Sequence, residues 1–109
     1  MKRSLILILF VLPTYVSAFS DGDLERLITT GNCPRCDLST ANLVGENLIG
    51  ADLSYSDLGN ANLTGVNLTE ANLTGANLAR VSLVNAKLTK AILAEAYLYD
   101  AKLVGADFS

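Results

Sequence analysis

The chain of 109 residues contains no histidine and only two cysteines. Histidine is a frequent acid–base catalyst near neutral pH and the commonest metal ligand, so the usual centre of both kinds of site is absent. Two cysteines without histidine cannot complete a four-ligand zinc site. The sequence also lacks the G-x-S-x-G, G-x-x-x-x-G-K and G-x-G-x-x-G motifs of hydrolases and nucleotide-binding proteins. We therefore expect no catalytic residue, no cofactor and no metal, and a protein that is not an enzyme.

Basic residues are scarce as well. The chain has eight basic and eleven acidic residues, and between Asp37 and Ala79 there are five acids and no base. From Arg80 onward four bases face three acids. Binding to nucleic acid needs a concentrated positive surface, so we expect no nucleic-acid partner.

What the chain does have is a strict internal repeat. Leucine stands at every fifth position from Leu38 to Leu103, and Phe108 continues the series, which gives fifteen centres in register. Ten of the centres have alanine two residues earlier, and ten follow Asn or Asp directly. A fixed period sustained over most of the chain predicts a repeat architecture.

A period of five fits neither a helix nor a straight strand. On a helix, successive leucines would be about 140° apart, and on a strand they would alternate between faces. A chain that bends by a similar angle in every repeat can point each leucine at one central axis. Asn, Asp, Gly, Ser and Thr fill the remaining positions, and these residues favour turns.

The tandem A(N/D)LXX pattern, seen in Ala41-Asn42-Leu43-Val44-Gly45, resembles the pentapeptide-repeat proteins over residues 36–109. The resemblance implies an all-β solenoid, a right-handed quadrilateral β-helix of nearly four coils with four pentapeptides per coil. The central leucine and the small residue two before it would point inward. Residues twenty apart would then stack, which pairs opposite charges at Glu70 and Lys90, Arg80 and Asp100, and Lys87 and Asp107.

Residues 1–18 have the pattern of a secretory signal peptide. Lys2 and Arg3 precede an apolar run from Leu5 to Leu12, and small residues end the segment at Ala18. The run is much shorter than the roughly 20 residues that span a bilayer, so we expect cleavage after Ala18 and no stable membrane insertion afterwards. Export would lead to the periplasm, the cell exterior or, as the resemblance allows, a thylakoid lumen.

Residues 19–35 separate the signal peptide from the repeats. Ser20 with Asp23 is a helix-capping pattern, and Leu24, Leu27 and Ile28 share one helical face. We expect a short helix at about residues 21–30 that covers the N-terminal end of the coil, where leucines and unpaired backbone would otherwise be open.

Cys33 and Cys36 flank Pro34 and Arg35 at the junction with the first repeat. A structural disulfide is favoured in an oxidising compartment. A thiol–disulfide redox centre is the second interpretation, although C-x-x-C redox motifs normally open a helix. Metal binding is the third, limited by the lack of further ligands.

Two polar features fall inside the repeats. Glu46 occupies an inward position, where we expect a distorted first coil that gives it access to the cap or to solvent. Three Asn-x-Thr sequons, at Asn62, Asn67 and Asn72, match the glycosylation motif, but the repeat itself generates Asn-Leu-Thr.

The last repeats carry apolar outward residues, and these define the C-terminal interaction surface: Ile92, Tyr97, Tyr99 and Phe108. We expect a homodimer or an unidentified protein partner at this end. The leading hypothesis is an exported, non-enzymatic scaffold or protein-interaction module. The alternatives are a DNA-mimicking gyrase-binding protein, which the resemblance suggests, and a small C-x-x-C redox protein.

Overall fold

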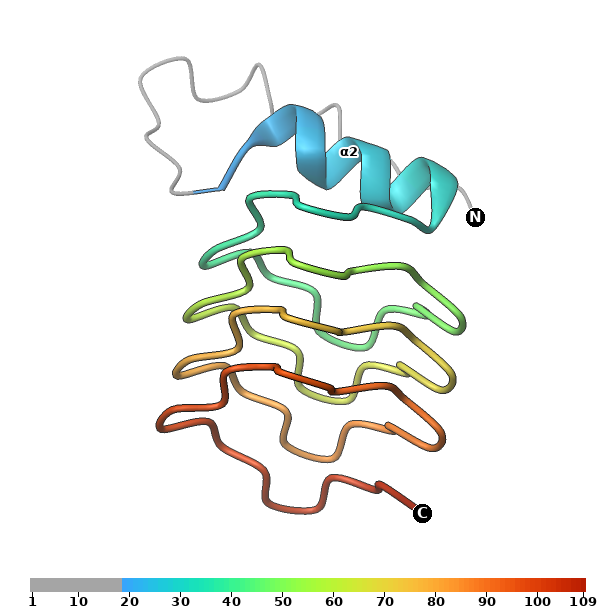
Figure 1. Ribbon diagram of the computed structural model, residues 1–109, viewed down its shortest axis with the longest axis vertical. Coiled ribbons are helices and arrows are strands. Elements are labelled where there is room, and N and C mark those ends of the chain that lie inside the picture. The colour runs from blue at the N-terminus through green and yellow to red at the C-terminus, as the bar shows by residue number, and fades with distance from the viewer. Residues whose placement is uncertain (1–18) are drawn as a thin grey trace.

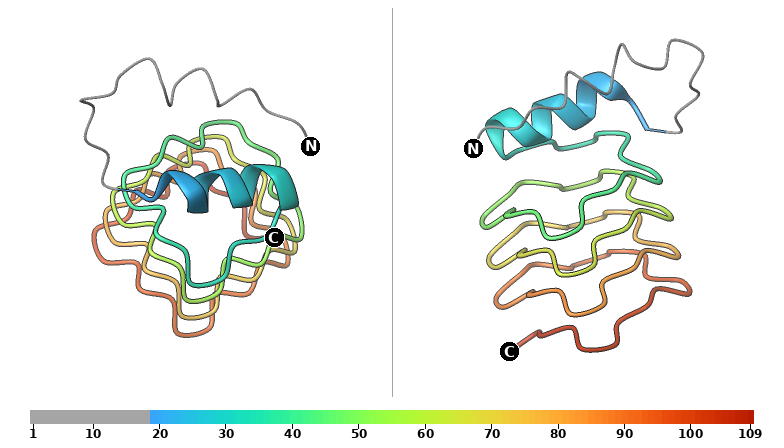
Figure 2. Two further views of the ribbon diagram at one scale, coloured as in Figure 1. Left: turned by 90° about the horizontal axis from the view of Figure 1, so that it is seen from above. Right: turned by 180° about the vertical axis from the view of Figure 1, so that it is seen from behind.

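The computed structural model describes residues 19–109, so the predicted signal peptide lies outside the described residues. In the described residues, the helix α2 (Asp21–Thr30) is followed by a stack of coils (Figure 1). Seen along the stack, the helix lies across the mouth of the first coil (Figure 2). This is the position expected for a cap. Within residues 19–109, none of the helical structure is long and apolar enough to cross a membrane.

Helix α2 begins and ends as its sequence predicts. The Ser20 hydroxyl accepts the Asp23 N–H at 3.3 Å, and Asp21 and Asp23 place negative charge in the first turn. Gly31 ends the helix with a φ of 80°, and its N–H donates to the Leu27 carbonyl at 2.8 Å. Leu27 and Ile28 are buried against the first coil, so the helix closes the end of the core.

The coils are held together by parallel bridges between residues twenty apart. One face is defined by Asp37, Asp57, Asn77 and Tyr97, each bridged to the next. In the described part of the chain this pairing is confined to single-residue bridges, because each face is short before the backbone turns. The twenty-residue coil expected from the sequence is therefore confirmed.

Each pentapeptide contains its own turn. The Ala41 N–H donates to the Leu38 carbonyl at 3.1 Å across Ser39 and Thr40, and Thr40 has a φ of 62°. A positive φ at the third residue of a turn is typical of type II turns. Glycine meets this requirement without strain at Gly45 and its equivalents, whereas Thr40 and nine other non-glycine residues adopt it within the coil. Repetition of this turn bends the backbone by a similar amount in every unit.

The Asn or Asp before each leucine also has a structural task. The Asn72 Oδ1 accepts the Thr74 N–H at 3.0 Å and the Thr74 hydroxyl at 2.6 Å. Equivalent bonds form at Asn62 and Asn67. These bonds satisfy backbone groups that the short faces cannot pair, in the manner of an Asx turn. They support the interpretation that the Asn-x-Thr sequences serve the repeat.

The core is a column of leucines with alanine and valine between them. The buried leucines of the repeats are all 1% exposed or less: Leu38, Leu43, Leu48, Leu53, Leu58, Leu63, Leu68, Leu73, Leu78, Leu83 and Leu88. Glu46 stands at an inward position as expected and is half-buried, with its Oε1 atom enclosed by protein. The repeats therefore bury their apolar residues along an axis, and their polar residues lie on the outer faces, apart from Glu46 and the buried Ser56.

Candidate functional site

Several carboxylates on the outer faces, among them Asp37, Asp52 and Asp57, accept local hydrogen bonds. Asp37 and Asp57 are exposed and bridge to each other on one face, and the Asp57 Oδ1 accepts the Asn77 amide at 3.0 Å. On the next face along the coil, hydrogen bonds from the side chain and backbone of Ser54 hold the pKa of Asp52 below its usual value. A lowered pKa keeps this carboxylate charged and unsuited to donating a proton at neutral pH.

The predicted C-terminal interaction surface is exposed. Tyr97 and Tyr99 are 59% and 57% exposed, and their rings lie 6.3 Å apart at an interplanar angle of 16°. The Arg80 guanidinium lies 5.5 Å from the centre of the Tyr99 ring. Ile92 and Asn72 are bridged to each other on the face next to the one that carries Tyr97. The surface therefore extends around a corner of the coil.

The core also opens toward this end. Leu93 and Leu98 are partly buried, Leu103 is 38% exposed and Phe108 is 47% exposed. The same positions are fully buried in the upper coils. The last coil lies at the end of the stack away from α2 (Figure 1), and its apolar side chains are exposed both on the outer faces and at the core positions Leu103 and Phe108.

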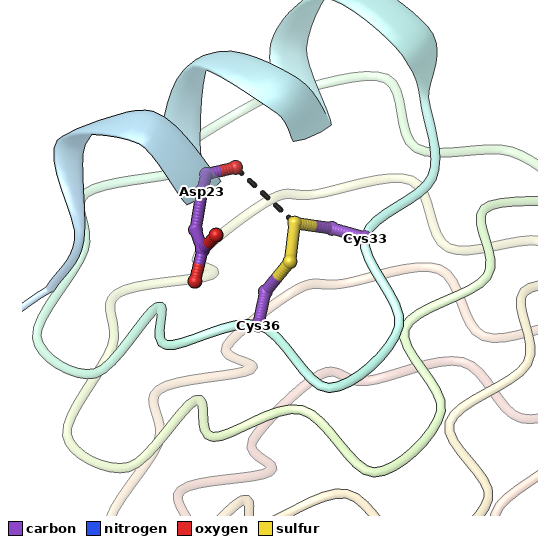
Figure 3. Close-up of side chains that lie close together, drawn as sticks. All are labelled: Asp23, Cys33 and Cys36. Atoms are coloured by element: carbon purple, nitrogen blue, oxygen red, sulfur yellow. Dashed lines mark hydrogen bonds between the residues drawn. A yellow bond between two sulfur atoms is a disulfide. The ribbon is translucent and has the colours of Figure 1, made fainter.

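The second cluster lies at the junction between α2 and the first coil. Cys33 and Cys36 are both buried, with sulfur atoms 1.96 Å apart and Cα atoms 5.5 Å apart, and they are drawn as a disulfide in Figure 3. Cys36 occupies the inward position that alanine holds in most other repeats. The pair closes a four-residue loop directly beneath the helix.

Side chains and backbone of α2 surround the two sulfur atoms. Arg26 donates from Nη2 to Cys36 Sγ at 2.7 Å and to the Pro34 carbonyl at 3.3 Å. The Asp23 carbonyl oxygen lies 3.2 Å from Cys33 Sγ, the contact marked in Figure 3. The contact of Arg26 with Cys36 could not be predicted from the sequence, because the position of Arg26 depends on how α2 crosses the coil. Arg26 lies three residues after Asp23 in the sequence, and this spacing indicates that the two residues share one face of the helix.

The sulfur atoms and an Asp23 carboxylate oxygen lie within 4.8 Å of one another, which is close enough for three metal ligands. In the structure, however, the sulfurs are bonded to each other, and only a thiolate binds a metal. The Arg26 guanidinium would also repel a cation there. The donor set does not fit a metal while the disulfide is present.

Comparisons with known proteins agree with this architecture. The family model for pentapeptide repeats matches residues 32–69 and 71–109, in eight copies. The crystal structure of alr5209, a pentapeptide-repeat protein from Nostoc PCC 7120, is 36% identical with a TM-score of 0.75, covering 86% of this chain and 80% of that one. A pentapeptide-repeat protein from the Arabidopsis thaliana thylakoid lumen is 33% identical over 72% of this chain and 58% of its own, with a TM-score of 0.44.

No curated protein matched the chain in a sequence comparison. The solved pentapeptide-repeat structures imply a right-handed quadrilateral β-helix, in agreement with the stacked coils and their spacing of twenty residues. With the repeat model covering most of the chain and the fold matching a solved relative, the protein belongs to the pentapeptide-repeat family.

Proposed function

We propose that this protein is an exported, non-enzymatic scaffold that acts by binding another protein. Pentapeptide-repeat proteins are generally non-enzymatic structural or interaction proteins. The observation that carries the proposal is the gathering of exposed apolar side chains on the last coil, at the end of a core that is otherwise filled with buried leucines. Exposed patches of this kind mark protein interaction sites.

The partner that fits the last coil best is a second copy of the chain. Leu103 and Phe108 expose apolar surface on the side away from α2, and Tyr97 and Tyr99 extend it around the edge. Helix α2 covers the opposite end of the stack (Figure 2), so end-to-end pairing of two copies would use their last coils. Pairing of identical ends by a two-fold axis closes at the dimer and does not continue into a fibre.

Sedimentation velocity of residues 19–109 at low to high micromolar concentrations tests this partner. We expect a concentration-dependent dimer, and we expect Tyr97→Lys to abolish it by placing a charge in the interface. Ile49→Lys is the matched control, since Ile49 is 53% exposed but lies on the first coil. A monomer at every concentration, or equal effects of the two substitutions, would refute the dimer. Protection of DNA gyrase in a supercoiling assay would instead support the DNA-mimic alternative.

The export part of the proposal rests on the signal-peptide pattern of residues 1–18 and on the Cys33–Cys36 geometry, which suits an oxidising compartment. It is tested by the intact, non-reduced mass of the protein from its native source. We expect a chain that begins at Phe19 and is lighter by two hydrogens than the same chain with both cysteines reduced. A full-length mass with free thiols would contradict both export and the disulfide.

A further inference from the structure

We propose that Cys33 and Cys36 form a thiol–disulfide exchange site for a dithiol reductant, in which Arg26 holds Cys36 as a thiolate after reduction. The proposal goes beyond the scaffold function and stands independently of it, because it rests on the junction beneath α2 and not on the last coil. Arg26 is a positioning residue, since it acts on the sulfur that reacts.

Cys36 has a cationic hydrogen-bond donor beside its sulfur atom. The Arg26 guanidinium already donates a hydrogen bond to Cys36 Sγ at 2.7 Å while the sulfur is neutral. Once the bond is reduced, the same contact becomes a charge-assisted hydrogen bond between guanidinium and thiolate, which is roughly twice as strong as a neutral one. The contact therefore stabilises the reduced state more than the oxidised state and favours reduction.

Cys33 has a hydrogen-bond acceptor beside its sulfur atom. In the disulfide, Cys33 Sγ carries no hydrogen, yet it lies 3.2 Å from the Asp23 carbonyl oxygen. A protonated Cys33 would donate a hydrogen bond along this contact. The two sulfurs thus meet different partners, an acceptor at Cys33 and a cationic donor at Cys36 (Figure 3). This asymmetry suits a thiol at Cys33 and a thiolate at Cys36.

A carboxylate also lies near the pair, because an Asp23 oxygen and the two sulfurs are within 4.8 Å of one another, whereas Arg26 donates directly to Cys36 Sγ. The Asp23 carboxylate opposes a thiolate, but its Oδ2 accepts the Asp37 N–H at 2.8 Å. The Asp37 carboxylate is turned to Ser39, whose hydroxyl donates to it at 2.8 Å. Arg35 lies between the two cysteines in sequence, but its guanidinium lies 5.0 Å from the centre of the Tyr55 ring. Arg26 is therefore the cation that faces Cys36.

The exchange transfers two electrons from a dithiol to the Cys33–Cys36 disulfide. One thiolate of the reductant attacks Cys33 Sγ, the Cys33–Cys36 bond breaks, and its electron pair leaves on Cys36, to which Arg26 donates when α2 is closed. The second thiolate of the reductant then attacks the mixed disulfide and expels Cys33, which takes up a proton. The dithiol reductant gives up two protons in forming its two thiolates and is oxidised to a disulfide by two electrons. One of these protons protonates Cys33, Cys36 remains a thiolate, and the other proton is released to water.

Access to the sulfurs requires movement of α2. Cys33 and Cys36 are 0% and 2% exposed beneath a helix that is anchored by Leu27 and Ile28. An incoming thiolate must approach along the sulfur–sulfur axis, and the folded cap leaves no room for it. Reduction is thus coupled to opening of the cap. Exchange is limited to reductants that react with the transiently opened form or bind to it.

The test is the equilibrium of the folded chain 19–109 with reduced and oxidised dithiothreitol at pH 7, quantified by alkylation and mass. We expect Arg26→Gln to make the disulfide about tenfold harder to reduce, equal to about 30 mV for a two-electron couple. Arg26→Lys, which keeps the charge, should restore most of the difference. Arg35→Gln is the matched control and should behave as the wild type, because Arg35 faces Tyr55.

A second measurement separates a chemical from a merely structural role for Arg26. In the Cys33→Ser variant, thiolate absorbance at 240 nm is followed against pH. We expect the pKa of the Cys36 thiol to lie below the ordinary cysteine value of about 8.5, and we expect Arg26→Gln to raise that pKa. Equal titration with and without Arg26, or an unchanged dithiothreitol equilibrium, would overturn the proposal. Stoichiometric Zn²⁺ binding by the reduced chain that is unaffected by Arg26→Gln would also overturn it, in favour of a metal site.

Discussion

Leu83 and Leu103 occupy the same repeat position one coil apart, and this makes them a matched pair for measuring how the core is closed. Leu83 is 1% exposed, with Leu63 on the coil above and Leu103 on the coil below, whereas Leu103 is 38% exposed. Both leucines are followed by valine and then by a residue of positive φ, Asn85 after Leu83 and Gly105 after Leu103. A difference between their alanine variants therefore reports burial.

The expected magnitudes follow from that difference. Leu83→Ala removes a fully buried side chain and leaves an enclosed cavity, which lowers the free energy of unfolding by about 3–5 kcal/mol. Leu103→Ala removes about six tenths of a buried side chain, judged from its 38% exposure. It leaves no enclosed cavity, so its cost is about 1–1.5 kcal/mol.

Urea denaturation followed by circular dichroism measures both values, at a concentration low enough to keep the chain monomeric. Leu63→Ala is the control and should cost as much as Leu83→Ala to within about 1 kcal/mol. Equal losses for Leu83→Ala and Leu103→Ala at low concentration would refute the reasoning. A cost of Leu103→Ala that grows with protein concentration would instead indicate that the last coil is covered by a second copy.

Two further predictions concern the outer faces. The Ser54 hydrogen bonds lower the pKa of Asp52 in the folded state, so the charged carboxylate stabilises the fold above its unfolded pKa of about 3.8. This stabilisation is lost as the pH falls through the lowered folded pKa, and Asp52→Asn should flatten the acid limb of a plot of unfolding free energy against pH; an unchanged limb would contradict the assignment. Gly50→Ala should cost about 1 kcal/mol because Gly50 has a positive φ with open space around it. Gly75→Ala should cost about 1 kcal/mol more in the same urea assay, since the new Cβ would meet the Tyr55 ring, and an equal cost would mean that the ring moves aside freely.

The coil could be predicted from the sequence because it is specified locally and repeatedly. A leucine at each fifth position requires one bend per pentapeptide, and the bridge from Asp37 to Asp57 confirms the length of the coil. The helix expected at about residues 21–30 is present as α2 for the same reason, since Ser20 and Gly31 define its ends within one short segment. The exposure of Tyr97 and Tyr99 followed from their outward register.

The side-chain contacts between elements could not be predicted in this way. Stacking by twenty residues paired Arg80 with Asp100, but the Arg80 guanidinium lies against the Tyr99 ring, which belongs to another register position. The Arg26 contact with Cys36 depends on the angle at which α2 crosses the first coil. No repeat pattern encodes that angle, because the helix lies outside the repeat. Sequence periodicity therefore fixes the columns of residues but not the directions of long side chains.

The bridges between residues twenty apart have a consequence for how such a chain tolerates changes in length. Insertion of twenty residues within the repeats adds one complete layer and leaves every column below it on its original face. Insertion of only five residues moves all later residues to the next face, about a quarter turn around the axis. The number of pentapeptides between α2 and Tyr97 thus determines which face of the coil carries the aromatic pair, and so the angle around the axis between that pair and the helix.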